Sequence, residues 1–327
     1  MARPLKTVAL GGGHGLQATL TALRSITPDV TAVVTVADDG GSSGRLRREL
    51  GLLPPGDLRK ALLALADESA WSAVFGHRFG GAGALAGHAV GNLVLAGLLE
   101  VLNDPLEALD TAGRLLGVHG RVLPMCTEPM DIEADVIGLA EDPDAVRRIR
   151  GQVAVATTPG RVLRVRLRTV RPGPPRACQA AVEAVRDADV VLLGPGSWFT
   201  SVLPHLLVPE LHDALVSTTA AKVIVLNLVP QPGETAGFSA ERHLDVLREH
   251  APKLRADAVI ADVNAVPMPE RFVAAAAQVG AKALLAAVAA SDAPERHDPV
   301  ALAGSLRQAI AALGAFPRKG GQRGDDR

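Results

Sequence analysis

The sequence predicts an α/β protein with a doubly wound, mainly parallel sheet and a small antiparallel insertion. Short apolar runs alternate with helical segments in the first third of the chain, and the same rhythm returns after residue 176. Apolar runs without a period of two are typical of parallel strands that are covered on both faces. By contrast, residues 121–170 alternate apolar and polar side chains, as a half-exposed antiparallel ribbon does.

The first third of the chain predicts two strands, each followed by a glycine-rich loop and a helix. Thr7–Leu10 and Thr31–Val36 are short runs rich in apolar and β-branched residues, which favour strands. Helices are expected from about Leu16 to Ser25 and over Gly44–Leu50. Three further helices are expected over Asp57–Glu68, Ala89–Leu102 and Pro105–Leu116.

The insertion is expected between Arg121 and Val170. The segments QVAVA (152–156) and RVLRVRLRTV (161–170) both alternate. In the second segment, Val165 and Leu167 fall on one face of a strand. Three basic residues fall on the other face: Arg164, Arg166 and Arg168. One face of this ribbon is therefore expected to meet water.

The strand and helix rhythm returns after the proline-rich break at residues 171–176. Four strands are expected within residues 189–193, 222–229, 256–263 and 281–288. The polar tail, residues 316–327, is expected to be disordered. We therefore expect residues 1–315 to form a single domain, with the insertion at about 121–170.

Composition narrows the class of protein. Hydrophobic residues make up 48% of the 327 residues, which is enough for a large core. The net charge of −1 does not indicate the basic surface that nucleic acid binding requires. The absence of tyrosine argues against aromatic side chains that stack on bases. The two cysteines lack metal-site spacing, which fits a reducing cytoplasm. The longest apolar stretch, residues 272–290, contains polar residues and glycine, so no membrane span is expected.

Ligands of doubly wound sheets bind at the carboxyl ends of the strands, so the loops there are the candidate site. After the first strand comes GGGHGLQ, with Gly11, Gly12, Gly13 and Gly15. Such glycines let backbone N–H groups approach a phosphate at a helix N-terminus. The dinucleotide pattern fails because Leu16 stands where its third glycine should be. The alternative is a tight turn, although four glycines in five residues exceed what a turn requires.

After the second strand comes ADDGGSSGRLR. Asp38 and Asp39 are candidates to bind Mg²⁺ or a ribose hydroxyl. Arg45 is a candidate to bind a phosphate in bidentate fashion. The residues between them are candidates for an anion nest: Gly40, Gly41, Ser42, Ser43 and Gly44. The alternative is an Asx-turn with a serine helix cap.

Two helix starts carry weaker signals. Asp57 follows two prolines, which suits any helix N-terminus. His88 and Asn92 are four residues apart, so they share a helical face and can act together.

Two later loops also follow strands. The loop GPGSWFT contains Gly194 and Gly196 for close backbone approach. It also contains Ser197 and Thr200, whose hydroxyl groups can donate to a phosphate. It is not the G-x-S-x-G elbow of a hydrolase. The next loop offers three polar candidates, for which a loop with a helix cap is the alternative: Asn227, Glu234 and Thr235.

Taken together, these segments resemble the CofD-like family, and specifically its YvcK-type gluconeogenesis factors. The resemblance spans about residues 7–299 and lies in five ordered motifs: GGG-x-G (11–15), ADDGGSSGRLR (37–47), PPGDLRK (54–60), GHAVGN (87–92) and GPGSWFTSVLP (194–204). QPGET (231–235) and RHDP (296–299) add to it. It implies a Rossmann-like fold. It also implies binding of a nucleotide sugar, especially UDP-N-acetylglucosamine, and a role in cell shape and wall synthesis during gluconeogenic growth.

The resemblance also implies particular residues. Related transferases move phospholactate from a guanosine diphosphate donor to a deazaflavin. They bind Mg²⁺ through acidic residues, and the resemblance implies that Asp39 and Asp57 are the metal ligands here. Arg296 is implied in uridine or diphosphate contact. Where the family has a tyrosine that stacks on the base, this chain has no tyrosine, and Phe272 is the expected replacement.

Three functions follow as hypotheses. The first is a cytoplasmic UDP-sugar sensor, which fits many phosphate-binding loops beside no evident nucleophile. The second is a Mg²⁺-dependent transferase that uses a nucleotide diphosphate donor. A nicotinamide dehydrogenase ranks last because the glycine spacing fails. A regulatory protein partner or Ser/Thr kinase, and a homodimer, are further expectations.

Overall fold

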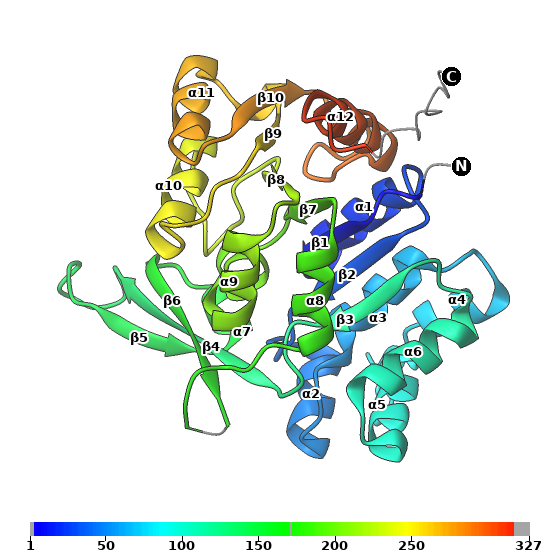
Figure 1. Cartoon of the computed structure of the whole chain (residues 1–327). Coiled ribbons are helices and arrows are strands. Elements are labelled where there is room, and N and C mark those ends of the chain that lie inside the picture. Colours follow the sequence, from blue (N-terminus) through cyan, green and yellow to red (C-terminus); the bar gives the residue numbers. More distant parts are fainter. Residues whose placement is uncertain (1–2, 171, 317–327) are drawn as a thin grey trace, which may run out of the picture.

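The computed structural model describes residues 3–170 and 172–316 (Figure 1). It contains a seven-stranded sheet in the order β10-β9-β8-β7-β1-β2-β3 and a three-stranded sheet in the order β5-β4-β6. All neighbours in the larger sheet are parallel, and those in the smaller sheet are antiparallel. The doubly wound sheet with an antiparallel insertion is confirmed.

The N-terminal half supplies one side of the larger sheet. Its elements are β1 (Thr7–Gly11), α1 (Gly13–Arg24), β2 (Val30–Val34), α2 (Gly41–Leu50), α3 (Pro55–Leu65), α4 (Ala70–Gly76), α5 (Val90–Leu102), α6 (Pro105–Leu116) and β3 (Arg121–Pro124). The strands β1 and β2 are buried almost throughout, because helices cover both faces of the sheet (Figure 1).

The smaller sheet follows. It consists of β4 (Met130–Ile137), β5 (Arg147–Arg150) and β6 (Arg161–Thr169), and the short helix α7 (Gln152–Ala156) connects β5 to β6. Buried and partly exposed residues alternate along β4, so one face of this sheet is in the core and the other meets solvent.

The C-terminal half supplies the other side of the larger sheet. Its elements are α8 (Gln179–Asp187), β7 (Val190–Leu193), the π-helical turn η1 (Trp198–Val202), η2 (Leu203–Leu207), α9 (Pro209–Ser217), β8 (Ala221–Val225), α10 (Ala240–His250), β9 (Ala258–Asp262), η3 (Val263–Ala265), α11 (Pro269–Gln278), β10 (Lys282–Ala286) and α12 (Pro299–Ala312).

The strand order reverses between β1 and β7. The chain runs from β1 outward to β3 and then returns to place β7 against the other side of β1. The carboxyl ends of β1 and β7 therefore diverge into loops that leave a crevice, which is where open α/β sheets bind ligands.

Two expectations about the insertion were wrong. Residues 121–124 form β3, which pairs in parallel with β2 and closes the larger sheet, so the insertion begins after Pro124. The segment 152–156 is the helix α7 and not a strand. Five alternating residues do not separate the two states. The helix is favoured here because the Asp39 carboxylate accepts a hydrogen bond from the Val153 amide in its first turn, at 2.9 Å.

No helix among the described residues is long and apolar enough to cross a membrane. Of the tail expected to be disordered, residues 317–327 lie outside the described residues.

Candidate functional site

Two adjoining cavities open at the crevice between β1 and β7. The larger has a volume of about 670 Å³ and the smaller about 220 Å³. Both are lined by His14 and Gly15 of α1, Gly196 after β7 and Gln231 after β8. Because these four residues are shared, one extended ligand can reach from one cavity into the other.

The glycine run shapes the wall between the cavities. A Cβ atom at Gly15 would lie 2.3 Å from the Pro195 carbonyl oxygen, so α1 approaches the GPGS loop as closely as backbone allows. Gly13 has φ of +62°, which favours glycine. Gly12, at the N-cap of α1, offers no capping side chain, so the first amides of the helix are free to bind an anion.

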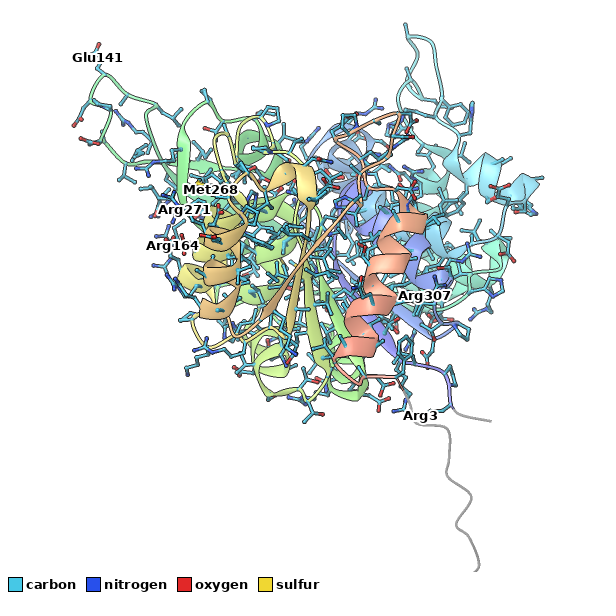
Figure 2. All side chains as sticks on the ribbon, turned by 90° about the horizontal axis from the view of Figure 1, so that it is seen from above. Arg3, Glu141, Arg164, Met268, Arg271 and Arg307 are labelled. Atoms are coloured by element: carbon cyan, nitrogen blue, oxygen red, sulfur yellow. The ribbon has the colours of Figure 1, made fainter. Side chains whose placement is uncertain are left out.

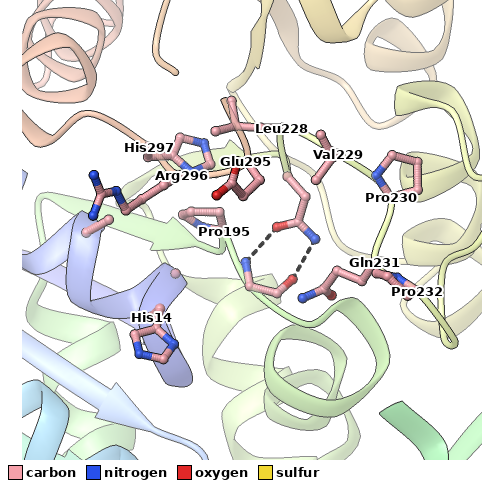
Figure 3. A pocket seen from close by; sticks show the side chains of 14 residues that line it. His14, Pro195, Leu228, Val229, Pro230, Gln231, Pro232, Glu295, Arg296 and His297 are labelled. Atoms are coloured by element: carbon pink, nitrogen blue, oxygen red, sulfur yellow. Dashed lines mark hydrogen bonds between the residues drawn. The ribbon is translucent and has the colours of Figure 1, made fainter. Parts of the chain in front are cut away.

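The GPGS loop is fixed by Asn227. Its side-chain amide accepts a hydrogen bond from the Gly196 N–H at 2.8 Å and donates one to the Gly196 carbonyl at 2.9 Å (Figure 3). Both polar groups of Asn227 are thereby used. Asn227 is a positioning residue for the loop, and it also lines the larger cavity.

The walls of the larger cavity are mostly apolar. They include Ala18 of α1. They also include Pro195 and the run Leu228, Val229 and Pro230 after β8 (Figure 3). Apolar walls with few polar groups are typical of a site that receives a flat ring.

Arg296 and His297 close the larger cavity from the loop before α12. The Arg296 guanidinium binds Asp292 at 2.9 Å, and its side chain is 63% exposed. The sequence prediction missed His297, which is only 7% exposed. Its Nε2 has no hydrogen-bond partner within the described chain, and burial lowers its pKa to about 4, so the ring is neutral at physiological pH.

Asp262, at the end of β9, holds the first part of the loop between β10 and α12. Its buried carboxylate accepts hydrogen bonds from the Val288 amide at 2.8 Å and the Ala289 amide at 3.0 Å. The sequence analysis did not select this residue, because its partners lie 26 and 27 positions away along the chain.

The smaller cavity is polar and contains two carboxylates. Asp57 is 5% exposed and forms an ion pair with Lys60 at 3.0 Å. Asp38 accepts a hydrogen bond from the Gly40 amide at 3.0 Å. Burial, and then the charge of Asp57, raise the pKa of Asp38 above its usual value. Both carboxylates line the same cavity with the hydroxyl groups of Ser197 and Ser201.

Asp39 is placed differently from its neighbour. Its carboxylate points to α7, where it binds the Val153 amide, and it lines neither cavity. The structure thus brings Asp38, and not Asp39, beside Asp57. Within the described residues, no three His, Cys, Asp or Glu side chains gather as a metal site. The insertion also contributes Gln152 of α7 to the smaller cavity, which the sequence analysis did not select.

His88 and Asn92 both contact the Ser42 hydroxyl, and they lie outside the lining of the cavities. Asn92 donates to the Ser42 hydroxyl at 2.9 Å, and that hydroxyl contacts His88 Nδ1 at 2.9 Å. Arg59 in turn donates to Asn92 at 2.9 Å. All four side chains are buried, and this network joins α2, α3 and α5. Arg45 donates to the Ala86 carbonyl at 2.7 Å, and it lines neither cavity.

Three further candidates lie just behind the GPGS loop. Thr200 is fully buried, and Thr235 accepts a hydrogen bond from the Gln231 amide at 2.8 Å. Glu234 is 2% exposed, and its carboxyl group is close to the hydroxyl groups of Ser197 and Thr200 and to the amides of Trp198 and Phe199. Burial raises the pKa of Glu234 to about 7, against a smaller opposite effect of the Ser197 hydroxyl.

Phe272 lies in α11 and is fully buried. It lines neither cavity. The residues of the sequence prediction that do line them are Gly12, Gly13, Gly15, Asp38, Asp57, Gly196, Ser197, Asn227 and Arg296.

Comparison with known proteins agrees with the fold. Residues 7–298 match the family model described as 2-phospho-L-lactate transferase CofD. The chain is 56% identical to a "Putative gluconeogenesis factor" of Mycobacterium tuberculosis over 98% of both chains. It is 40% identical to a "Gluconeogenesis factor" of Halalkalibacterium halodurans, over 74% of this chain and 73% of that protein.

A crystal structure of a member of the UPF0052 family from Bacillus halodurans superposes with a TM-score of 0.83 and 31% identity. It covers 94% of this chain and all of that chain. The chain therefore belongs to the CofD family and, within it, to the group of gluconeogenesis factors.

Proposed function

We propose that the protein binds a nucleotide sugar of the UDP-N-acetylglucosamine type and acts as a cytoplasmic regulator. The observation that carries this proposal is the pair of adjoining cavities at the crevice, one walled by apolar side chains and one by polar groups. A nucleotide sugar has the matching chemistry, because a flat base and a charged diphosphate lie at neighbouring positions along one molecule.

The residues that line the two cavities define the contacts that we propose for the ligand. The base lies among the apolar residues after β8, near the neutral His297. The diphosphate lies at the N-terminus of α1 and on Gly196 and Ser197, where backbone amides and a hydroxyl donate. Arg296 supplies a guanidinium to balance the negative charge.

The cellular role that we propose is control of cell shape and wall synthesis during growth on gluconeogenic carbon. The names of the relatives support the link to gluconeogenesis. A strain that lacks the gene is expected to lose its shape on gluconeogenic carbon. The parent gene is expected to restore it, and a gene carrying Ser197→Ala is not. Regulation through a protein partner or a Ser/Thr kinase belongs to this proposal.

Transfer of a group from a nucleotide diphosphate donor is the second candidate function. Asp38 and Asp57 favour it, because two carboxylates that share a small cavity with serine hydroxyls offer the hard oxygen ligands that Mg²⁺ prefers. Burial, and then the charge of Asp57, raise the pKa of Asp38, and a divalent cation bound between the two carboxylates would offset both effects. Bound Mg²⁺ would supply charge neutralisation at the diphosphate. Lys60, paired with Asp57, would orient that carboxylate.

Site variants test the proposed contacts. Ser197→Ala and Arg296→Ala are each expected to weaken binding of UDP-N-acetylglucosamine about tenfold, because each removes one donor to a charged group. Arg45→Ala is the matched control, and it is expected to bind within about twofold of the parent because Arg45 lines neither cavity. Isothermal titration calorimetry measures all three. Equal affinities for all four proteins would contradict the site.

The two candidate functions differ in their dependence on metal. If the protein is a transferase, it turns over a guanosine or uridine diphosphate donor, and this turnover stops when a chelator removes Mg²⁺. The turnover is also lost in Asp57→Asn. The regulator requires binding without turnover. Chromatography of the nucleotide products distinguishes these results.

A further inference from the structure

The exposed face of the three-stranded sheet carries an unusual excess of arginine. We call this surface the arginine face. It consists of Arg148 and Arg150 on β5 and of Arg164, Arg166 and Arg168 on β6. Arg47 reaches its edge from α2, with a side chain that is 13% exposed. The opposite face is apolar and buried, for example at Ile132, Ala134 and Val136. The strand alternation therefore directs all of these β5 and β6 arginines to one side.

Three carboxylates of β4 lie among the arginines without balancing them. Asp131 binds both Arg47, at 2.5 Å, and Arg150. Asp135 binds both Arg166, at 2.6 Å, and Arg148, at 3.1 Å.

The third carboxylate, Glu133, binds Arg168 at 3.2 Å. Arg164 has no ion pair within the described chain. Six guanidinium groups thus face three carboxylates, and three positive charges remain.

The geometry of these arginines is suited to a partner with carboxylates. Each shared carboxylate holds its two guanidinium groups in place, which leaves further N–H donors on side chains that are 40–59% exposed on β5 and β6. The arginines of β6 repeat every second residue, about 7 Å apart. An extended peptide with an acidic residue at every second position has the same repeat.

We propose that the arginine face is a docking surface for an extended acidic segment of a partner protein. The surplus charge provides the complementarity. A nucleic acid fits less well, because the face has no aromatic side chain for base stacking and three carboxylates lie in its middle strand. The β4–β5 hairpin projects from the body of the molecule, with Glu141 at its end, and Arg164 lies on the outer side of the molecule, so the approach to this sheet is open (Figures 1 and 2).

The arginine face is separate from the nucleotide cavities. None of its arginines, nor Arg47 at its edge, lines either of them. The docking surface therefore goes beyond the proposed function, and its failure in a test would leave the nucleotide site untouched.

A peptide of six Glu-Thr repeats, labelled with fluorescein, tests the proposal by fluorescence anisotropy with the full chain. The parent is expected to bind it, and binding is expected to weaken as salt is raised from about 0.05 M to 0.3 M. A Lys-Thr repeat of equal length is expected not to bind. The double variant Arg164→Gln, Arg166→Gln is expected to bind the acidic peptide at least about tenfold more weakly. Its fold is expected to persist because Asp135 keeps Arg148.

The matched control is the double variant Arg114→Gln, Arg186→Gln, which removes two exposed arginines from α6 and α8. It is expected to bind like the parent. Thermal unfolding of each variant shows that it is folded. Three results would overturn the proposal: no binding of the acidic peptide, equal loss in both double variants, or tighter binding of an oligothymidine than of the peptide.

Discussion

Replacing Gly15 by alanine is expected to abolish measurable binding of UDP-N-acetylglucosamine, with an affinity at least about 100-fold below the parent. The new Cβ would lie 2.3 Å from the Pro195 oxygen, 2.6 Å from the Pro195 carbonyl carbon and 2.8 Å from the Gly196 Cα. All three atoms belong to the backbone, so no side-chain rotation relieves the clash. Helix α1 and the GPGS loop must separate, and together they form the shared wall of both cavities. The free energy of unfolding is expected to fall by about 3 kcal/mol.

Gly97→Ala is the matched control. Gly97 lies inside α5, and a Cβ added there would meet no atom within 4 Å beyond its chain neighbours and the backbone of its own helix. Alanine there is expected to leave ligand affinity unchanged and to raise stability by about 0.5–1 kcal/mol. Urea unfolding and calorimetry measure both properties. If Gly15→Ala binds ligand as well as Gly97→Ala does, the contact between α1 and the GPGS loop does not shape the site.

Glu234→Gln is expected to change how stability depends on pH. The folded protein raises the pKa of Glu234 from 4.5 to about 7, so the folded state keeps a proton that the unfolded state loses. Below pH 4.5 Glu234 is protonated in both states, so its ionisation does not lower the free energy of unfolding. Between pH 4.5 and about 7 the unfolded state gains an advantage, and the parent loses stability on the order of 3 kcal/mol. Glutamine, which does not ionise, is expected to remove this loss.

Thermal unfolding at pH steps between 4 and 8 measures the difference between the two proteins. The variant is expected to match the parent at pH 4 and to be the more stable at pH 8. Glu68→Gln, at an exposed site, controls for the removal of one carboxyl group. A difference between parent and Glu234→Gln that stays constant across these pH values would contradict the buried, protonated state of Glu234.

The fold was predictable because its strands are short apolar runs followed by loops with a high content of glycine. Thr7–Leu10 and the four later strand segments all lie in the larger sheet. The two errors have one physical origin, because short segments are decided by their tertiary partners. Residues 121–124 pair with β2, and residues 152–156 become helical on the Asp39 cap.

The site was predictable only as a set of loops. Asp38 and Asp39 are adjacent aspartates, so the sequence does not show which one faces the ligand. Asp38 lines a cavity and Asp39 caps α7, because the direction of the backbone after β2 orients the two side chains differently. His88 and Asn92 do not share a helical face, because His88 lies before α5, which begins at Val90. Both side chains contact the Ser42 hydroxyl and not the cavities. His297 lies in the RHDP motif, of which the sequence analysis selected only Arg296. Gln152 carries no local signal, since its place beside the cavity depends on contacts far away along the chain.

Calorimetric titration of the purified protein with UDP-N-acetylglucosamine tests the central claim most directly. It is performed with and without Mg²⁺, beside GDP and NAD. The account predicts saturable binding of the uridine nucleotide with one site per chain, tighter than that of GDP or NAD. No detectable binding of the uridine nucleotide, or a preference for GDP only when Mg²⁺ is present, would contradict the proposed regulator. The second of these results would favour the transferase.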